Sequence, residues 1–397
     1  MKRIIKLFWV TVILVLTGCW RDAVVDHHTK NGDWLSKSIL DLTVAKEAEI
    51  TANNDQISAA VLDLLVASSR DFGVTNGELG YFSTRILEHF QDVLPYRIAF
   101  SDREQETASW ILALLAAMGF TAEQIMVQPF KVDVVTSSWW HPPAEIVELF
   151  ASRGYYDDKI RVDESKNIIL TIPGHSDTTI IVGAHYDSVN VPGISDNAAG
   201  VAVLLETIYR LRNEEPYYTL KFIFTGAHEY QVAGLFYFVD NLPTAVVDNL
   251  LLFINVDNLL CGPEQRFAIG ALEWLPEIPA NLFWQPDQRP TVVQNDLTMQ
   301  ITGIATVLNT TYETFSFVSE PRMIFQPGDH SAFLQLAIPV MFMRGTYPVV
   351  YPILSSSTIW HSPLDNLDFI MNAYPGLVEQ ALTSFGRFLE LVLLGEF

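Results

Sequence analysis

The chain is organised around residues 180–200, which read Ile180-Ile-Val-Gly-Ala-His185-Tyr-Asp187-Ser188-Val-Asn-Val-Pro-Gly-Ile-Ser195-Asp196-Asn197-Ala-Ala-Gly200. An apolar run ends in His185 and Asp187, and a Pro-Gly loop follows it. Asp196 then stands just before a segment with helical spacing, Ala198 to Leu211. Strand, polar tip, turn and helix is how an α/β protein places functional side chains at the carboxyl end of a strand. Histidine and aspartate are also good ligands for a divalent metal.

Outward from this stretch, apolar strand patterns alternate with helical patterns over roughly residues 100–397. Such alternation predicts an α/β fold, with a mainly parallel mixed sheet flanked by helices on both faces. Before it, residues 39–69 have the spacing of a helix, and so do residues 83–93. Ser101, with Glu104 three residues later, is typical of a helix start, and we expect that helix to run to Met118.

The composition narrows the class of protein. The chain has 397 residues, 49% of them hydrophobic, which is enough for a large α/β domain with an appendage. Its net charge of −22 disfavours nucleic acid as a partner, because phosphate binding needs a basic surface. Only two cysteines, Cys19 and Cys261, are present, so we expect neither a disulfide framework nor a cysteine-rich zinc site.

The amino terminus has the pattern of a targeting signal. A basic start is followed by a short apolar stretch, residues 7–16, and then by Leu16-Thr17-Gly18-Cys19. This pattern is similar to a bacterial lipoprotein signal, in which the cysteine receives lipid and becomes the first mature residue. We therefore expect an extracytoplasmic protein anchored to a bacterial membrane through Cys19, with an uncleaved signal anchor or ordinary secretion as alternatives. Residues 20–36 are then expected to be a tether.

Histidines and acidic residues follow five apolar segments of the chain. They are His185 with Asp187, Asp196, His228 with Glu229, Asp257, and His361. If these segments end at one edge of a sheet, their carboxylates form a cavity of like charge, which is costly unless a cation neutralises it. Two histidines and three carboxylates suit two divalent ions that share a bridging carboxylate.

These segments, in this order, carry a resemblance. From about Arg97 to the end, the chain resembles the co-catalytic zinc exopeptidases related to bacterial leucyl aminopeptidase, a fold family that includes glutamate carboxypeptidases and glutaminyl cyclases. The matching segments are the entry helix over residues 102–119, residues 167–174, 183–188 and 195–200, the strand ends at Glu229 and Asp257, Gly328-Asp329-His330-Ser-Ala-Phe333, and residues 361–365. The resemblance implies the zinc-exopeptidase, phosphorylase-hydrolase-like fold over residues 97–397, preceded by a signal peptide over 1–19, the tether, and a helical accessory segment over 37–96.

The resemblance also implies a role for each site residue. Asp196 would bridge two zinc ions. One site would be completed by His185 and Asp257, and the other by Glu229 and His361. Asp187 would orient the His185 imidazole, and Asp329 would contact substrate or support the site.

One position departs from the family pattern, which has two consecutive glutamates at the strand end before Tyr230. The first of these glutamates is the general base, and here His228 stands in its place. Three interpretations follow. His228 serves as the base, another carboxylate such as Asp329 takes over, or metals bind and hydrolysis is weak or lost.

The resemblance therefore implies a zinc metallopeptidase that removes N-terminal residues from peptide substrates. Two alternatives stay open: cyclisation of N-terminal glutamine, or a metal- or peptide-binding lipoprotein impaired in catalysis because of His228. The sequence carries no indication of the oligomeric state.

Overall fold

The computed structural model describes residues 44–46, 56–131, 164–272, 291–326, 328–346 and 359–397. The chain divides into two compact units, Met1–Ala52 and Asn53–Phe397, and the elements below belong to the second. Cys19, the predicted signal peptide and the tether lie outside the described residues, so these predictions and the boundaries drawn at 36 and 96 stay predictions. Among the helices of the described residues, none has the length and apolarity that crossing a membrane requires.

The second unit is built on a mixed sheet that the described residues form from nine strands. The strands on its main path follow the order β1-β2-β4-β3-β5-β9-β6-β7, and β8 pairs with β6. They are β1 Ile125–Lys131, β2 Glu164–Ile172, β3 Ser176–His185, β4 Tyr218–Thr225, β5 Leu250–Val256, β6 Glu264–Leu272, β7 Val292–Val293, β8 Val318–Ser319 and β9 Val340–Thr346.

Parallel pairing occupies the middle of this sheet, where β4, β3, β5 and β9 run side by side. Antiparallel pairs flank it, with β1 and β2 on one side and β6 and β7 on the other. Consecutive residues of the central strand β3, Ile180, Ile181 and Val182, are all fully buried. A strand buried on both faces reads as a continuous apolar run, which is the pattern that the sequence showed here. The predicted α/β fold with a mixed sheet is confirmed.

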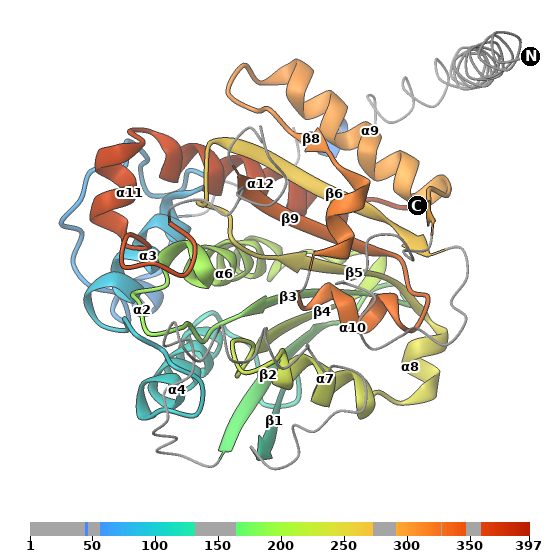
Figure 1. Cartoon of the computed structure of the whole chain (residues 1–397), viewed down its shortest axis with the longest axis horizontal. Coiled ribbons are helices and arrows are strands. Elements are labelled where there is room, and N and C mark those ends of the chain that lie inside the picture. Colours follow the sequence, from blue (N-terminus) through green and yellow to red (C-terminus); the bar gives the residue numbers. More distant parts are fainter. Residues whose placement is uncertain (1–43, 47–55, 132–163, 273–290, 327, 347–358) are drawn as a thin grey trace, which may run out of the picture. The chain divides into compact units, whose positions relative to one another are not determined.

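Helices cover the sheet (Figure 1). The described helical elements are α2 Ala59–Leu62, α3 Tyr81–Asp92, α4 Asp102–Ala117, the turn Ile194–Ala198, α6 Ala199–Leu211, α7 Ala233–Asp240, α8 Thr244–Asp248, α9 Asp296–Thr311, the 3₁₀ turn Pro321–Phe325, α10 His330–Leu334, α11 Leu367–Ala373 and α12 Leu377–Leu393. Helix α6 packs on β3 and carries α3 and α12 on its outer side. Helices α7 and α10 pack on the strands through a separate apolar cluster, in which Phe333 of α10 stacks on Phe253 of β5.

Helix α3 is tied to α6 by a buried carboxylate. Its N-cap is Gly80 in a left-handed conformation, which offers no side chain to the helix N-terminus. Glu206 of α6 takes that place, because it accepts hydrogen bonds from the backbone N–H groups of Gly80 and Ser83 and from the Ser83 hydroxyl. An acidic side chain is favourable at a helix N-terminus. The segment before residue 97 is therefore attached to the sheet domain through polar as well as apolar contacts.

One local prediction was wrong, and one strand was missed. The helix predicted through Ser69 ends at Leu62, because the buried Glu88 accepts the N–H groups of Ser69 and Arg70 and holds them in an irregular path. Strand β6 was not predicted, since its first residues, Glu264, Gln265 and Arg266, interrupt the apolar pattern. The predicted helices over residues 83–93 and 102–118 are confirmed as α3 and α4.

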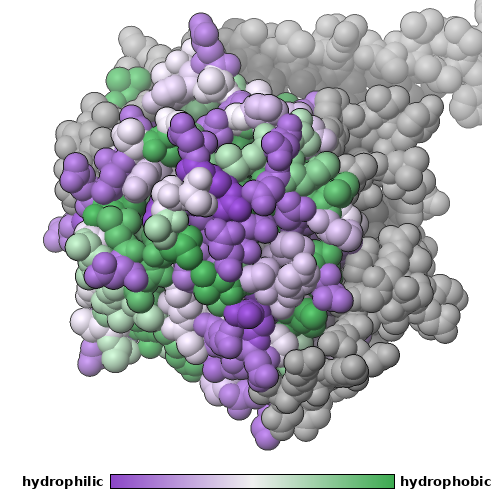
Figure 2. All heavy atoms as spheres, turned by 90° about the vertical axis from the view of Figure 1, so that its left-hand side faces the viewer, coloured by the Kyte–Doolittle hydropathy of each residue, from purple (hydrophilic) through white to green (hydrophobic). Residues whose placement is uncertain are grey.

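The face that carries α2, α3 and α11 mixes hydrophilic and hydrophobic surface (Figure 2). Large apolar side chains that stay exposed include Val93, Tyr96 and Leu364. Exposed apolar residues are normal on a protein surface and by themselves indicate no partner.

Candidate metal and catalytic site

The predicted site residues meet at the carboxyl ends of the central strands. His185 ends β3, His228 and Glu229 follow β4, and Asp257 follows β5. The carboxyl ends of parallel strands lie at one edge of a sheet, so adjacent strands bring these side chains together. His361 joins them from the loop before α11, where it has a positive φ of 53°.

Asp196 lies at the centre of this group. Its Oδ1 atom is 3.0 Å from Nε2 of His185, and its Oδ2 atom is 3.0 Å from Nε2 of His361. On the first side, Oδ1 of Asp257 is 3.5 Å from Nε2 of His185. On the second, Oε1 of Glu229 is 3.3 Å from Nε2 of His361. The two oxygens of one carboxylate thus face two separate pairs of side chains, which is the arrangement predicted for a bridging ligand.

The geometry of these atoms fits divalent metal ions. Around a tetrahedral zinc with ligands at 2.0–2.2 Å, neighbouring ligand atoms are roughly 3.3–3.6 Å apart, close to the separations measured here. Nε2 of His185 and Oε1 of Glu229 are buried and make no hydrogen bond with the described residues. Buried polar atoms without partners are rare, and a metal would supply the missing partner. The atoms of His185, Asp196 and Glu229 lie within 4.8 Å of one another.

The charges in this cluster depend on one another. Burial lowers the pKa of His185 and of His361, but the surrounding carboxylates outweigh it and raise both well above the ordinary value. Burial raises the pKa of Asp196, and the two imidazoles outweigh it and hold that pKa well below its usual range. Positive charge beside the ionised carboxylates therefore stabilises them, and a bound cation would also provide that charge.

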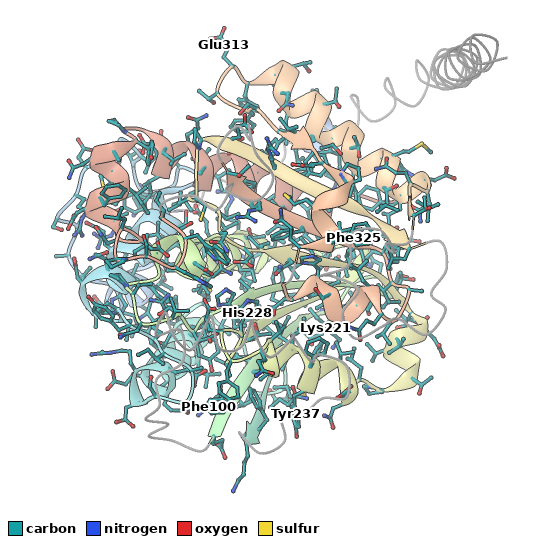
Figure 3. The ribbon with its side chains drawn as sticks, viewed as in Figure 1. Phe100, Lys221, His228, Tyr237, Glu313 and Phe325 are labelled. Carbon is teal, nitrogen blue, oxygen red and sulfur yellow. The ribbon has the colours of Figure 1, made fainter. Side chains whose placement is uncertain are left out.

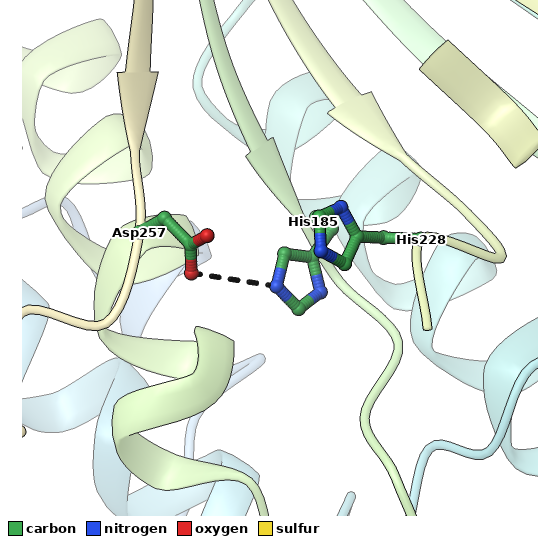
Figure 4. A group of neighbouring side chains, drawn as sticks. All are labelled: His185, His228 and Asp257. Atoms are coloured by element: carbon green, nitrogen blue, oxygen red, sulfur yellow. Dashed lines mark ion pairs between the residues drawn. The ribbon is translucent and has the colours of Figure 1, made fainter. Parts of the chain in front are cut away.

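His228 lies against His185, drawn with Asp257 in Figure 4, and its place in the whole molecule is marked in Figure 3. Its ring stacks on the His185 ring, with centroids 3.9 Å apart and planes 8° apart. An imidazole binds a metal in the plane of its ring, so two parallel stacked rings cannot direct their nitrogens at the same ion. Although the atoms of His185, His228 and Asp257 lie close enough to suggest a site of their own, this stacking excludes a shared ion.

Asp329 fixes the other side of the His228 ring. Its Oδ1 atom is 2.6 Å from Nδ1 of His228, and its Oδ2 atom accepts a hydrogen bond from the Thr225 hydroxyl. Burial and the neighbouring His185 lower the pKa of His228, but the negative charges of Asp329 and Glu229 raise it to about 9. Asp329 is fully buried and both of its oxygens are engaged, so it orients His228 rather than facing the metal ligands itself.

Comparison with known proteins identifies the fold's relatives. Residues 167–385, more than half of the 397-residue chain, match peptidase family M28. The chain belongs to peptidase family M28. The predicted resemblance to zinc exopeptidases is confirmed.

Individual M28 relatives match parts of the chain. A probable lipoprotein aminopeptidase of Mycobacterium tuberculosis, LpqL, is 37% identical over 117 residues, which cover 28% of this chain and 23% of that protein. The alkaline phosphatase isozyme conversion protein of Escherichia coli is 24% identical over 201 residues, 48% of this chain and 54% of that protein. The chain thus spans about a quarter to a half of the length of these curated relatives.

Solved structures share the M28 fold. A zinc aminopeptidase from Bacillus subtilis aligns with a TM-score of 0.55 and 15% identity over 79% of this chain and 94% of its own. A glutaminyl cyclase from an Acidobacteriales bacterium aligns with a TM-score of 0.55 and 16% identity over 82% and 98%. At these identities the likeness extends to the fold.

In this M28 site, Asp187 contacts more than the His185 ring. Nδ1 of His185 lies 3.1 Å from the backbone oxygen of Asp187 and 3.4 Å from its carboxylate. The two carboxylate oxygens also accept the backbone N–H groups of His228 and Glu229. Asp187 therefore connects the end of β3 to the loop after β4. Its predicted role of orienting His185 stays a prediction.

Several groups that hold the site together were not predicted from the sequence. Asp365 accepts the backbone N–H groups of Ser195 and Asp196, and burial together with the negative charge of Asp196 raises its pKa to about 7. Asn197 donates to the carbonyl of Val256 and so ties the Asp196 loop to β5. These contacts join parts of the chain that are 59 to 170 residues apart in the sequence.

Arg97 is a further group whose role the sequence did not indicate. Its side chain is fully buried, and its guanidinium donates to the carbonyls of Tyr186, Leu94, Pro192 and Gly193. Burial lowers its pKa to about 10, against the opposing effect of nearby carboxylates. Arginine stays charged under these conditions. Its hydrogen bonds to the carbonyls of Tyr186, Pro192 and Gly193 hold the loop between His185 and Asp196 in place.

Proposed function

We propose that this chain is a zinc-dependent aminopeptidase. The observation that carries the proposal is Asp196, whose two carboxylate oxygens face His185 and Asp257 on one side and His361 and Glu229 on the other. Membership of peptidase family M28 supports a peptide substrate, and the fold shared with a zinc aminopeptidase is compatible with it.

The five side chains would supply ligands for two ions, with His185 and Asp257 at one, His361 and Glu229 at the other, and Asp196 shared between them. Zinc bound there would polarise the scissile carbonyl and lower the pKa of a water molecule. The protein's part is to fix the ligand atoms. Asp365 and Asn197 hold the Asp196 loop, and Asp187 holds the loop of Glu229.

We assign the proton transfer to His228. Its Nδ1–H donates to Asp329, which leaves Nε2 on the opposite side of the ring as the atom that gives or takes up a proton. With its pKa at about 9, the ring keeps both protons at neutral pH, so base catalysis by His228 requires the positive charge of metal bound beside it to lower that pKa. This is the orienting contact that a histidine base needs, since the carboxylate selects one tautomer. The pairing also argues against Asp329 as a replacement base, because both of its oxygens are already engaged.

The proposal is tested on the purified full-length protein. Aminoacyl-arylamides are offered as substrates, with and without a chelator, alongside a metal count by mass spectrometry. We expect chelator-sensitive release of the arylamine and up to two zinc ions per chain. Peptides with N-terminal glutamine provide the second arm, because cyclisation without hydrolysis would replace the proposed activity by a cyclase activity. A protein that retains zinc but turns over neither substrate would refute catalysis.

The substitution at the base position favours a second candidate, a metal- or peptide-binding protein impaired in catalysis. His228→Glu separates the two. Under the proposed function, wild type is active and His228→Ala loses roughly 10²–10⁴-fold in kcat. Under the second candidate, wild type is inactive and His228→Glu creates activity.

We further propose that lipid on Cys19 anchors the protein on the outer side of a bacterial membrane. The support is the short apolar stretch over residues 7–16, followed by Thr17-Gly18-Cys19. Metabolic labelling with a radioactive fatty acid should mark the wild-type protein and leave Cys19→Ser unlabelled. Equal labelling of both proteins would contradict the assignment.

A further inference from the structure

The loop Gly226–Glu229, which carries the proposed base and one metal ligand, is held by its backbone. Four consecutive N–H groups each donate to a buried side chain. The partners are Asn167 for Gly226, Glu104 for Ala227, and the two carboxylate oxygens of Asp187 for His228 and Glu229. Asp187 and Asn167 lie on or beside strands next to β4, whereas Glu104 belongs to helix α4.

Glu104 is fully buried and uses both of its oxygens. One accepts from the N–H of Ala227 and from the Ser165 hydroxyl, each at 2.8 Å. The other accepts from the N–H of Phe100 at 2.7 Å. Ser101 caps the helix as the sequence predicts, but the Glu104 side chain reaches away from the cap residue toward the loop after β4. Burial and the nearby Asp187 raise its pKa to about 8, against the opposing effect of the hydrogen bonds from Ser165, Phe100 and Ala227.

The loop needs such a restraint because its backbone is strained. Ala227 has a positive φ of 51°, a conformation that costs free energy for a residue with a side chain. Gly226 lies close against β2, since a Cβ atom there would lie 2.3 Å from the Ser165 Oγ atom. A change at Ala227 would rotate the peptide that carries His228 and displace Glu229 after it.

We propose that Glu104 is a positioning residue that fixes Ala227 and, through it, places His228 and Glu229 for metal binding and catalysis. The catalytic part of the inference rests on the proposed function. The metal-binding part requires only that Glu229 is a metal ligand. Phe100, whose N–H completes the Glu104 set, also packs edge-on against Tyr230, the residue after Glu229. Helix α4 thus contacts the loop through the Glu104 carboxylate, and the Phe100 ring, just before the helix, contacts the residue that follows the loop.

The chain offers a matched control for Glu104. Glu206 is also a buried glutamate that accepts two backbone N–H groups and one serine hydroxyl, but its donors are Gly80 and Ser83 at the start of α3. Glu104→Gln and Glu206→Gln both replace one acceptor oxygen by an amide that faces an N–H group. We therefore expect similar losses of thermal stability in the two variants, and different effects on the site.

The test measures zinc affinity by competition with a chromogenic chelator, amide hydrogen exchange, and steady-state kinetics. In Glu104→Gln we expect roughly 10–100-fold weaker zinc binding, lower kcat with little change in KM, and faster exchange of the amides of residues 226–229. In Glu206→Gln we expect wild-type zinc affinity and kcat, with faster exchange confined to residues 80–83.

Equal zinc affinity and loop exchange in wild type and Glu104→Gln would overturn the inference, because Glu104 would then be structural only. If Glu104→Gln does not fold, Glu104→Asp keeps the charge but shortens the reach to Ala227, and the same readouts decide. If wild type shows no peptidase activity, the proposed function fails, whereas zinc affinity and exchange still test Glu104.

Discussion

The Oδ1 atom of Asp329 lies 2.6 Å from Nδ1 of His228. Replacing Asp329 tests whether His228 transfers a proton or only packs in the site. Asp329→Asn keeps the size of the side chain but replaces the charged acceptor by an amide, which weakens the hold on Nδ1–H and the selection of one tautomer. We expect kcat to fall roughly 10–100-fold while zinc content and KM stay near wild type.

Steady-state kinetics and a metal count on Asp329→Asn test this expectation. Thr225→Ser is the control, since it retains the hydroxyl that donates to the second oxygen of Asp329. An unchanged kcat in Asp329→Asn would assign His228 to packing rather than to proton transfer.

His330 follows Asp329 directly and has a purely structural environment. It is fully buried, its Nε2 atom is 2.9 Å from the carbonyl oxygen of Ile324, and its ring stacks on Phe342. Burial lowers its pKa to about 4, against the opposing effect of the Ile324 carbonyl and nearby carboxylates.

This depressed pKa makes stability depend on pH. The unfolded chain takes up a proton near pH 6.5 and the folded chain near pH 4, so the stabilisation is present above about pH 6.5 and is lost as the pH falls toward 4. Between pH 7 and pH 5 we expect His330 to account for about 2 kcal/mol of the decrease in the free energy of unfolding.

Urea titrations of wild type and His330→Gln at pH 7 and pH 5 measure that share. The decrease should be smaller in the variant by about this amount. His175→Gln serves as the control, because its side chain is 63% exposed and its replacement should leave the decrease unchanged. Equal decreases in wild type and His330→Gln would show that His330 is not the group responsible.

At the scale of elements, the short helix α10 places Asp329 beside the strands. Phe333 of α10 stacks on Phe253 of β5 with centroids 4.1 Å apart, and both rings are fully buried. Phe333→Ala should destabilise the protein by about 3–5 kcal/mol through lost burial and the cavity that remains. Phe333→Leu, which keeps most of the volume, should cost clearly less. Denaturant unfolding measures both, and equal stability of Phe333→Ala and wild type would contradict the packing role of α10.

The sequence predicted elements best where one periodicity dominated. The continuous apolar run of β3 and the amphipathic pattern of α12 needed no tertiary information. Strand β6 was missed because the buried Gln265 and its charged neighbours break the apolar pattern, although antiparallel pairing with β9 holds them in a strand. The helix expected through Ser69 failed for a related reason, since Glu88, a residue distant along the chain, captures its N–H groups.

At the scale of the whole molecule, metal binding at the ligand cluster should increase the free energy of unfolding. The carboxylates of Asp196, Asp257 and Glu229 lie close together in a buried site, and a bound cation removes their repulsion. At a metal concentration about 1,000 times Kd, binding adds about 4 kcal/mol to the free energy of unfolding. Chelation should therefore lower Tm, and zinc should restore it. A Tm indifferent to chelator, or an equal response in His361→Ala, would contradict metal binding at this site.

That the five proposed metal ligands come together could be predicted, because each follows an apolar segment and matches a family motif. The residues that hold them in place could not, because nothing near Glu104 in sequence points to Ala227, and nothing near Asp365 points to Ser195. Such pairs form only when the chain folds and brings distant segments together. The departure at His228 was visible in the sequence, but its partner Asp329 was recognisable as a partner only in three dimensions.

The contact between Glu206 and the start of α3 bears on where an autonomous folding unit begins. The family match starts at residue 167, yet the donors to Glu206 lie at Gly80 and Ser83. A polypeptide trimmed to residues 97–397 would lose α3 and would expose to water the apolar side chains of α6 that α3 covers in the intact chain. We expect such a fragment to be insoluble or unfolded by circular dichroism, and one that starts at residue 56 to fold. The region that the family shares and the smallest fragment expected to fold therefore begin at different residues in this protein.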